Sequence, residues 1–318
     1  MTRPALLDWA LRDRAPRDRP PGDRPRGVPA PGAVPSGPMS RSVMPSRVKP
    51  GRGRAAKQAA AELSRRGPHE VLRGDLAPAG LPGVVFTPRS GFGLPAVAFG
   101  RGWLQPPARY EELLRHLASW GIVAACPGTQ GGVLPSHQEY AADLRITLDI
   151  CTGVRLGDGQ ISVDPDRLGL AGHGMGGGCA VLAATSEPRT RAVATLALAE
   201  TRPSSVDAAR RCEAPAMHLA AGKDRIAPAA GNAEAVAQAW AGPVQLRTLT
   251  KASHLGFTRG WHWTDLVLDG SPEGGTRRIS RALVTAFLLH HLAGRLEHDA
   301  LLDGDVSTAT LAELTAAG

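Results

Sequence analysis

The 318-residue chain has only four cysteines, and their spacing fits neither a metal site nor a redox pair. The absence of any C-x-x-C motif argues against zinc ribbons, and we expect reduced, mostly buried thiols. No long apolar run approaches the roughly 18 residues of a membrane-spanning helix. The N-terminal segment lacks the apolar region of a secretory signal, so we expect the protein to be cytoplasmic. The four cysteines are Cys126, Cys151, Cys179 and Cys212.

The net charge of +8 is concentrated near the N-terminus. Residues 1–66 hold fifteen Lys and Arg against five Asp and Glu, whereas the rest of the chain holds 22 against 24. The first segment is also rich in proline and poor in apolar residues, so we predict a disordered basic arm over 1–66. A basic arm can attract nucleic acid. We nevertheless expect a solvated arm without a partner.

Strand and helix signals alternate from about residue 68 onward, which predicts an α/β fold with a mostly parallel sheet and helices on both faces. We place this domain at 67–300 and a C-terminal tail at 301–318. Ligands of such sheets bind at the carboxyl ends of the strands. Strands are expected at 84–86, 94–99, 122–126, 168–171, 192–198, 216–220 and 244–249, and helices at 107–120, 136–151, 229–240, 277–293 and from the glycine-rich turn to 184.

A glycine-rich turn follows the apolar strand at 168–171. Its sequence, Gly172-His173-Gly174-Met175-Gly176, matches the nucleophile-elbow pattern G-x-S-x-G except at the centre. The elbow raises one side chain above the sheet from a strained backbone, which glycine adopts without cost. Gly174 is therefore expected to preserve the turn while removing the attacking hydroxyl.

An acid and a histidine follow in the chain order of a Ser-Asp-His triad. Asp224 comes just after one strand and His254 just after the last predicted strand. The carboxylate would orient the imidazole, which would act as general base. Backbone N–H groups of Met175 and of the turn at Gly102-Trp103 would form an oxyanion hole.

From about residue 80 to 292 the chain resembles the bacterial polyester-hydrolase and cutinase-like branch of the dienelactone-hydrolase group. This resemblance implies an α/β-hydrolase fold and ester hydrolysis by a serine nucleophile, with Trp103 donating its backbone N–H to the oxyanion. Gly174 departs from that pattern. The motifs are Phe99-Gly100-Arg101-Gly102-Trp103, Leu117-Ala118-Ser119-Trp120-Gly121, the elbow with Gly177-Gly178, Gly222-Lys223-Asp224 with Ile226-Ala227-Pro228, and Ser253-His254.

Neither of two nearby groups is expected to replace the missing serine. Cys179 lies five residues along the helix, off the face of Gly174, and the ring of His254 cannot easily reach back to Ser253. A water molecule activated by His254 is the more plausible nucleophile. No cofactor is expected, because the sequence has no phosphate-cradling loop and the glycines after Met175 are explained by close packing of helix on sheet. No metal is expected, because the cysteines lack metal-ligand spacing.

Several other residues carry a structural interpretation. We expect His173 to be a packing residue, His218 a core histidine, and the pair His290 and His291 ordinary surface residues. The segment Trp261-His262-Trp263 either lines the cleft beyond His254 or packs a loop, and the sequence does not separate the two.

Two functions follow from these residues. The protein is either a weak or altered ester hydrolase, or a catalytically inactive pseudoenzyme that binds a small-molecule ester or lipid-like ligand or acts as a scaffold. The intact Asp224 and His254 favour the first, and Gly174 favours the second. A third hypothesis, nucleic-acid binding through the arm, predicts affinity that falls steeply with salt.

Overall fold

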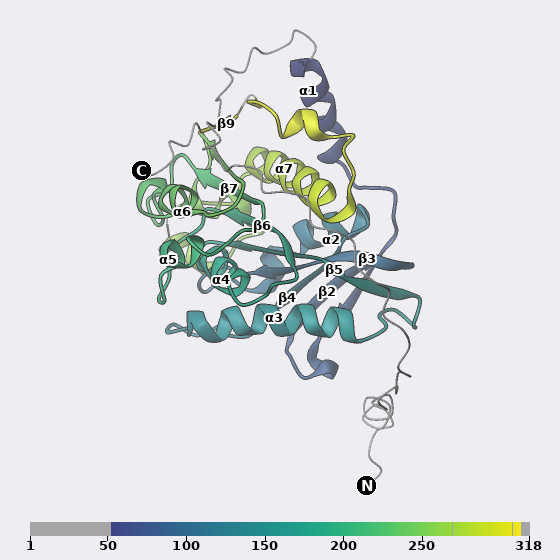
Figure 1. Cartoon of the computed structure of the whole chain (residues 1–318). Coiled ribbons are helices and arrows are strands. Elements are labelled where there is room, and N and C mark those ends of the chain that lie inside the picture. The colour runs from purple at the N-terminus through teal and green to yellow at the C-terminus, as the bar shows by residue number, and fades with distance from the viewer. Residues whose placement is uncertain (1–51, 269, 307, 313–318) are drawn as a thin grey trace, which may run out of the picture. The chain divides into compact units, whose positions relative to one another are not determined.

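The computed structural model describes residues 52–268, 270–306 and 308–312. Within them, the apolar runs of the chain form the centre of a mixed nine-stranded sheet (Figure 1). The strands are β1 (Val71–Asp75), β2 (Gly83–Pro88), β3 (Gly91–Gly100), β4 (Val123–Pro127), β5 (Ile161–His173), β6 (Thr190–Leu196), β7 (Ala216–Ala221), β8 (Val244–Leu249) and β9 (Ala309–Leu311).

The strand order is β1-β2-β4-β3-β5-β6-β7-β8-β9. Strands β3 to β8 pair in parallel with one another, whereas β1, β2 and β9 add antiparallel edges. Strand β5 lies at the centre, and its last residues are fully buried, because helices cover both faces there. The carboxyl ends of β3, β5, β7 and β8 therefore meet along one edge of the sheet.

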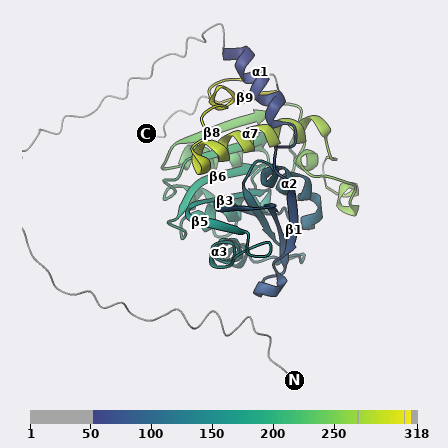
Figure 2. The ribbon, with the colours of Figure 1, turned by 90° about the vertical axis from the view of Figure 1, so that its right-hand side faces the viewer.

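Six of the seven α-helices of the described residues cover the two faces of this sheet, and the first helix packs on the last (Figures 1 and 2). Helices α2 and α7 pack on one face, and α3, α4, α5 and α6 on the other, each over a core of buried apolar side chains. The predicted α/β fold is confirmed. The helices are α1 (Arg52–Leu63), α2 (Glu111–Ser119), α3 (His137–Gly153), α4 (Met175–Ala184), α5 (Ser205–Ala209), α6 (Ala233–Ala239) and α7 (Gly274–Ala293).

The predicted arm over 1–66 was wrong in its last part. Residues 52–63 form α1, which contacts α7, and Leu63 is fully buried in the core on that face. Composition misled the prediction, because the alanines of this segment form a helix whose buried side is narrow. Residues 1–51, and with them the predicted disorder, lie outside the described residues.

The predicted tail over 301–318 also differs from the structure. Leu301 and Leu302 are buried, and β9 pairs with β8 at the edge of the sheet. Arg247, a fully buried residue of β8, donates hydrogen bonds to the carbonyls of Leu302 and Gly304 and so holds this segment against the sheet. Residues 313–318 lie outside the described part of the chain.

Two helices are shorter than predicted, because 3₁₀ turns precede them. The segment 107–109 is a 3₁₀ turn before α2, and 229–231 is another before α6. No helix among the described residues combines the length and the apolar character needed to cross a bilayer.

Candidate active site

The predicted elbow is a sharp bend between β5 and α4. Gly174 joins the two elements with φ 53° and ψ −124°, a backbone conformation that side-chain-bearing residues rarely adopt. Its N–H donates to the carbonyl of Leu196 at 3.0 Å, and its carbonyl accepts from Ala199 at 3.0 Å. The bend is therefore fixed by the neighbouring strand β6 and the loop after it.

The glycines after Met175 allow α4 to approach the sheet closely. A Cβ atom at Gly176 would overlap with the backbone of Gly100 on β3, and one at Gly178 with the carbonyl of Ala199. At Gly178 the helix approaches the loop after β6, and at Gly176 the close helix–sheet packing predicted for this glycine run is confirmed. It brings the first turn of α4 next to the end of β3.

Asp224 and His254 form a buried hydrogen-bonded pair. Asp224 Oδ2 lies 2.7 Å from His254 Nδ1, and Asp224 Oδ1 accepts from the N–H groups of Ile226 and Ala227. Burial alone would raise the pKa of Asp224, but the hydrogen bonds from His254 and the two backbone groups lower it below its usual value. Asp224 is therefore a carboxylate near neutral pH, and it holds His254 with Nδ1 as the donor.

The other ring nitrogen of His254 faces the elbow. A Cβ atom built on Gly174 would lie 3.0 Å from His254 Nε2 and 3.3 Å from Cε1. Among the described residues no side chain or backbone group hydrogen-bonds to His254 Nε2. The structure therefore brings the three predicted residues Gly174, Asp224 and His254 together, with the basic nitrogen beside the glycine.

Trp103 and Met175, the predicted oxyanion donors, flank the same point. A Cβ atom at Gly174 would lie 3.8 Å from the Cα of Gly102, the residue before Trp103. Met175 is the first residue of α4, so its N–H has no partner within the helix. Neither this N–H nor that of Trp103 donates to another described residue.

Both tyrosines of the chain hold the segment that leads into Trp103. Tyr140 Oη accepts from the N–H of Arg101 at 2.9 Å, and Tyr110 Oη accepts from the N–H of Gly102 at 3.1 Å. Sequence reasoning missed this role. The scarcity of tyrosine, two residues in the whole chain, is the only signal that could have drawn attention to them.

His173 connects Tyr110 to the backbone of His254. Its Nε2 lies 2.9 Å from the carbonyl of His254 and its Nδ1 lies 2.8 Å from Tyr110 Oη. A carbonyl only accepts, so Nε2 carries the proton and Nδ1 accepts from the tyrosine hydroxyl. Burial, with the nearby charge of His254, lowers the pKa of His173 to about 3, which keeps this ring neutral. The predicted packing residue thus also links the two sides of the site.

The two groups considered as substitute nucleophiles are placed elsewhere. Cys179 is fully buried in the apolar core between α4 and α3, and burial raises the pKa of its thiol to about 12. Ser253 Oγ donates to Glu273 Oε1 at 2.7 Å. Neither group contacts His254 Nε2, and both therefore stay outside the candidate chemistry.

A loop after His254 carries two exposed tryptophans and is held by a buried arginine. Trp261 is 73% and Trp263 51% exposed. Beneath them Arg109, a buried residue, pairs with Asp265 at 2.6 Å and also donates to the carbonyls of Arg259 and Gly260. Trp261 therefore lies largely in solvent, whereas Trp263 is about half-buried.

The remaining predicted residues are structural. His218 is fully buried, with Nδ1 2.8 Å from Thr195 Oγ1, and His290 Nδ1 lies 2.7 Å from Asp299. All four cysteines are buried and free. The described residues contain no group of three or more His, Cys, Asp or Glu side chains arranged to hold a metal ion.

Comparison with known proteins agrees with the α/β fold. The family model described as PET hydrolase-like matches residues 50–260, about two thirds of the chain. The match begins at the start of α1, which places this helix with the domain. No curated protein gives a significant match.

Proposed function

Because the chain belongs to the PET hydrolase-like family, we propose that it is a slow carboxylic-ester hydrolase in which His254 activates water in place of a serine. One observation carries this proposal. His254 Nε2 is oriented by Asp224, lies beside Gly174, and meets no hydroxyl or thiol of the described residues.

In the proposed reaction, His254 Nε2 removes a proton from water as its oxygen attacks the ester carbonyl carbon. The carbonyl oxygen becomes an oxyanion, which the N–H groups of Trp103 and Met175 would stabilise. Collapse of this intermediate breaks the bond to the alcohol oxygen, which takes the proton from His254. The products are one carboxylic acid and one alcohol, with no covalent intermediate on the protein.

The expected rate is low. Loss of the serine from a triad enzyme lowers turnover about 10⁶-fold, while the remaining groups retain roughly 10³-fold over the uncatalysed reaction. A site of this kind would therefore hydrolyse activated esters measurably and ordinary esters poorly.

Exposed apolar side chains around the site support an ester or lipid-like ligand. Trp103 Nε1 donates to the carbonyl of Val133, and Gln105 bridges the carbonyl of Trp103 to Thr264, the neighbour of Trp263. These contacts join the loop of Trp103, which approaches the elbow through Gly102, to two other loops that carry exposed apolar side chains. The exposed side chains are Trp103, Val133, Leu134, Trp261, Trp263, Leu266 and Val267.

The second candidate function is ester binding without turnover. Gly174 itself favours it, because the residue preserves the elbow and offers no attacking atom. The two candidates share the same ligand class and differ only in whether His254 performs chemistry.

Ester hydrolysis by His254 is tested on short-chain p-nitrophenyl esters. We expect a slow rate above buffer for the natural chain, loss of that rate in His254→Ala, and no loss in His69→Ala, which removes an exposed histidine. Serine-directed phosphonates should not inhibit. Full inhibition by a phosphonate would contradict water attack, and ester binding without any His254-dependent rate would favour the second function.

A further inference from the structure

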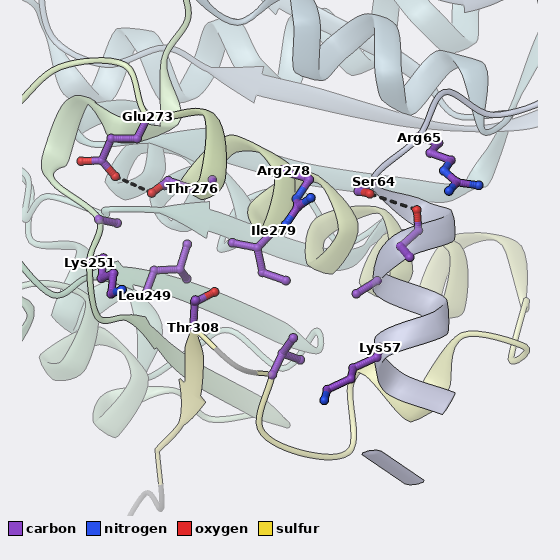
Figure 3. A pocket seen from close by; sticks show the side chains of 15 residues that line it. Lys57, Ser64, Arg65, Leu249, Lys251, Glu273, Thr276, Arg278, Ile279 and Thr308 are labelled. Atoms are coloured by element: carbon purple, nitrogen blue, oxygen red, sulfur yellow. Dashed lines mark hydrogen bonds between the residues drawn. The ribbon is translucent and has the colours of Figure 1, made fainter. Parts of the chain in front are cut away.

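A separate cavity of about 550 Å³ lies between α1, α7 and the segment after β8 (Figure 3). Lys57 reaches it from α1, Lys251 from the segment after β8, and Arg278 from α7. In Figure 3, Lys57 and Lys251 lie on opposite sides, with Ile279 of α7 between them. A cavity of this volume is large enough for a small organic ligand.

The charges around this cavity are predominantly positive. Arg65, just after α1, is the fourth cationic side chain, and within residues 52–268, 270–306 and 308–312 none of the four forms an ion pair. Glu273 is the one carboxylate of the lining, and its oxygens already accept from the hydroxyls of Ser253 and Thr276. The lining therefore keeps a net positive charge, with four cationic side chains against one carboxylate.

The N-terminus of α7 adds partial positive charge to that of the cationic side chains. The helix begins at Gly274, and Gly275 and Thr276 of its first turn line the cavity. The first N–H groups of a helix lack intrahelical partners and carry a partial positive charge, which favours a negative group near them.

The floor of the cavity is apolar. Leu249 and Ala252 are almost fully buried there, and Ile279 and Ala60 are partly buried beside them. An inorganic anion would make no contact with the apolar surface that Ile279 and Ala60 leave open, and a neutral ester would make no use of the cations.

We propose that this cavity binds an anion with one acidic head and an apolar body, such as a medium-chain carboxylate. The head would pair with Lys57 and Arg278, which come from the neighbouring helices α1 and α7, and the body would extend past Ile279. Residues 1–51 do not fit as the occupant, because their net charge has the same positive sign as that of the cavity. The inference is independent of the proposed function, since the cavity does not include His254.

Calorimetric titration of the full chain with octanoate tests this site. We expect saturable binding to octanoate, at least about tenfold weaker binding of acetate, which lacks the body, and at least about tenfold weaker binding of 1-octanol, which lacks the charge. Equal affinity for acetate and octanoate, or for octanol and octanoate, would overturn the proposal, as would no binding of octanoate.

Paired variants locate the binding. Lys57→Gln combined with Arg278→Gln should weaken octanoate binding about tenfold. Arg54→Gln combined with Arg66→Gln removes the same charge from exposed positions outside the lining, and should leave binding unchanged. An equal effect of both pairs would show that net charge, not this cavity, captures the anion.

Discussion

Gly174 combines a conformation that favours glycine with a position that faces a histidine. With φ 53° it relieves the strain that a serine would experience in the same bend. Its missing Cβ would stand 3.0 Å from His254 Nε2, so the imidazole has come a few tenths of an ångström closer than a side chain would allow. In the proposed hydrolase, this residue would keep the architecture of the site while changing its chemistry.

Gly176 is the residue on which the approach of α4 to the sheet depends. The substitution Gly176→Ala should destabilise the protein by about 3 kcal/mol, because the added methyl overlaps with the backbone of Gly100. Urea unfolding measures this loss of stability. Gly53→Ala is the matched control, since a Cβ there meets nothing within 4 Å and alanine favours the helix. Similar stabilities of the two variants would contradict the packing account.

At the scale of elements, the loop after His254 depends on one buried ion pair. Asp265→Asn removes the partner of Arg109, whose side chain is only 4% exposed, and should cost about 3–5 kcal/mol. Glu111→Gln breaks an exposed pair with Arg73 and should cost less than about 1 kcal/mol. Chemical denaturation of both variants compares the two. Equal small losses would show that Arg109 does not anchor the loop.

Elements with continuous apolar runs were predictable, and elements defined by distant partners were not. The strand expected at 216–220 is β7 (Ala216–Ala221), because a strand buried on both faces is apolar throughout. The short edge strands β1 and β9 have no such run. Helix α1 was missed because its burial depends on α7, more than two hundred residues away in the sequence.

The same division applies to the candidate site. Gly174, Asp224 and His254 stand in local motifs directly after strands, so their meeting at one edge of the sheet followed from the fold. The network through Tyr110 and His173 could not be predicted in this way. Its two hydrogen bonds join residues that are 63 and 81 positions apart in the sequence, and no motif surrounds Tyr110.

At the scale of the whole molecule, buried neutral histidines make stability depend on pH. Burial lowers the pKa of both His173 and His218 to about 3, while in the unfolded chain each histidine titrates near 6.5. Below pH 6.5 the unfolded state therefore binds more protons than the folded state. The contribution of these histidines to the free energy of unfolding is complete above pH 6.5 and is lost as the pH falls toward 3. At pH 5 each of the two buried histidines should lower the free energy of unfolding by about 2 kcal/mol relative to neutral pH.

Urea unfolding at pH 7.5 and pH 5 measures this loss. In His218→Leu the difference between the two pH values should shrink by about 2 kcal/mol, whatever the variant's stability at pH 7.5. His69→Leu, which changes an exposed histidine, should leave the difference as it is in the natural chain. A pH-independent free energy of unfolding in the natural chain would contradict the buried neutral histidines.

The central claim is that Gly174 stands where the site's nucleophile would act, and Gly174→Ser tests it most directly. Assayed on p-nitrophenyl butyrate, this variant should gain at least about 10³-fold over the natural chain and become sensitive to serine-directed phosphonates. Gly174→Ala, which adds the Cβ without the hydroxyl, should gain nothing. A folded Gly174→Ser variant with no gain, or an equal gain in both variants, would contradict the account.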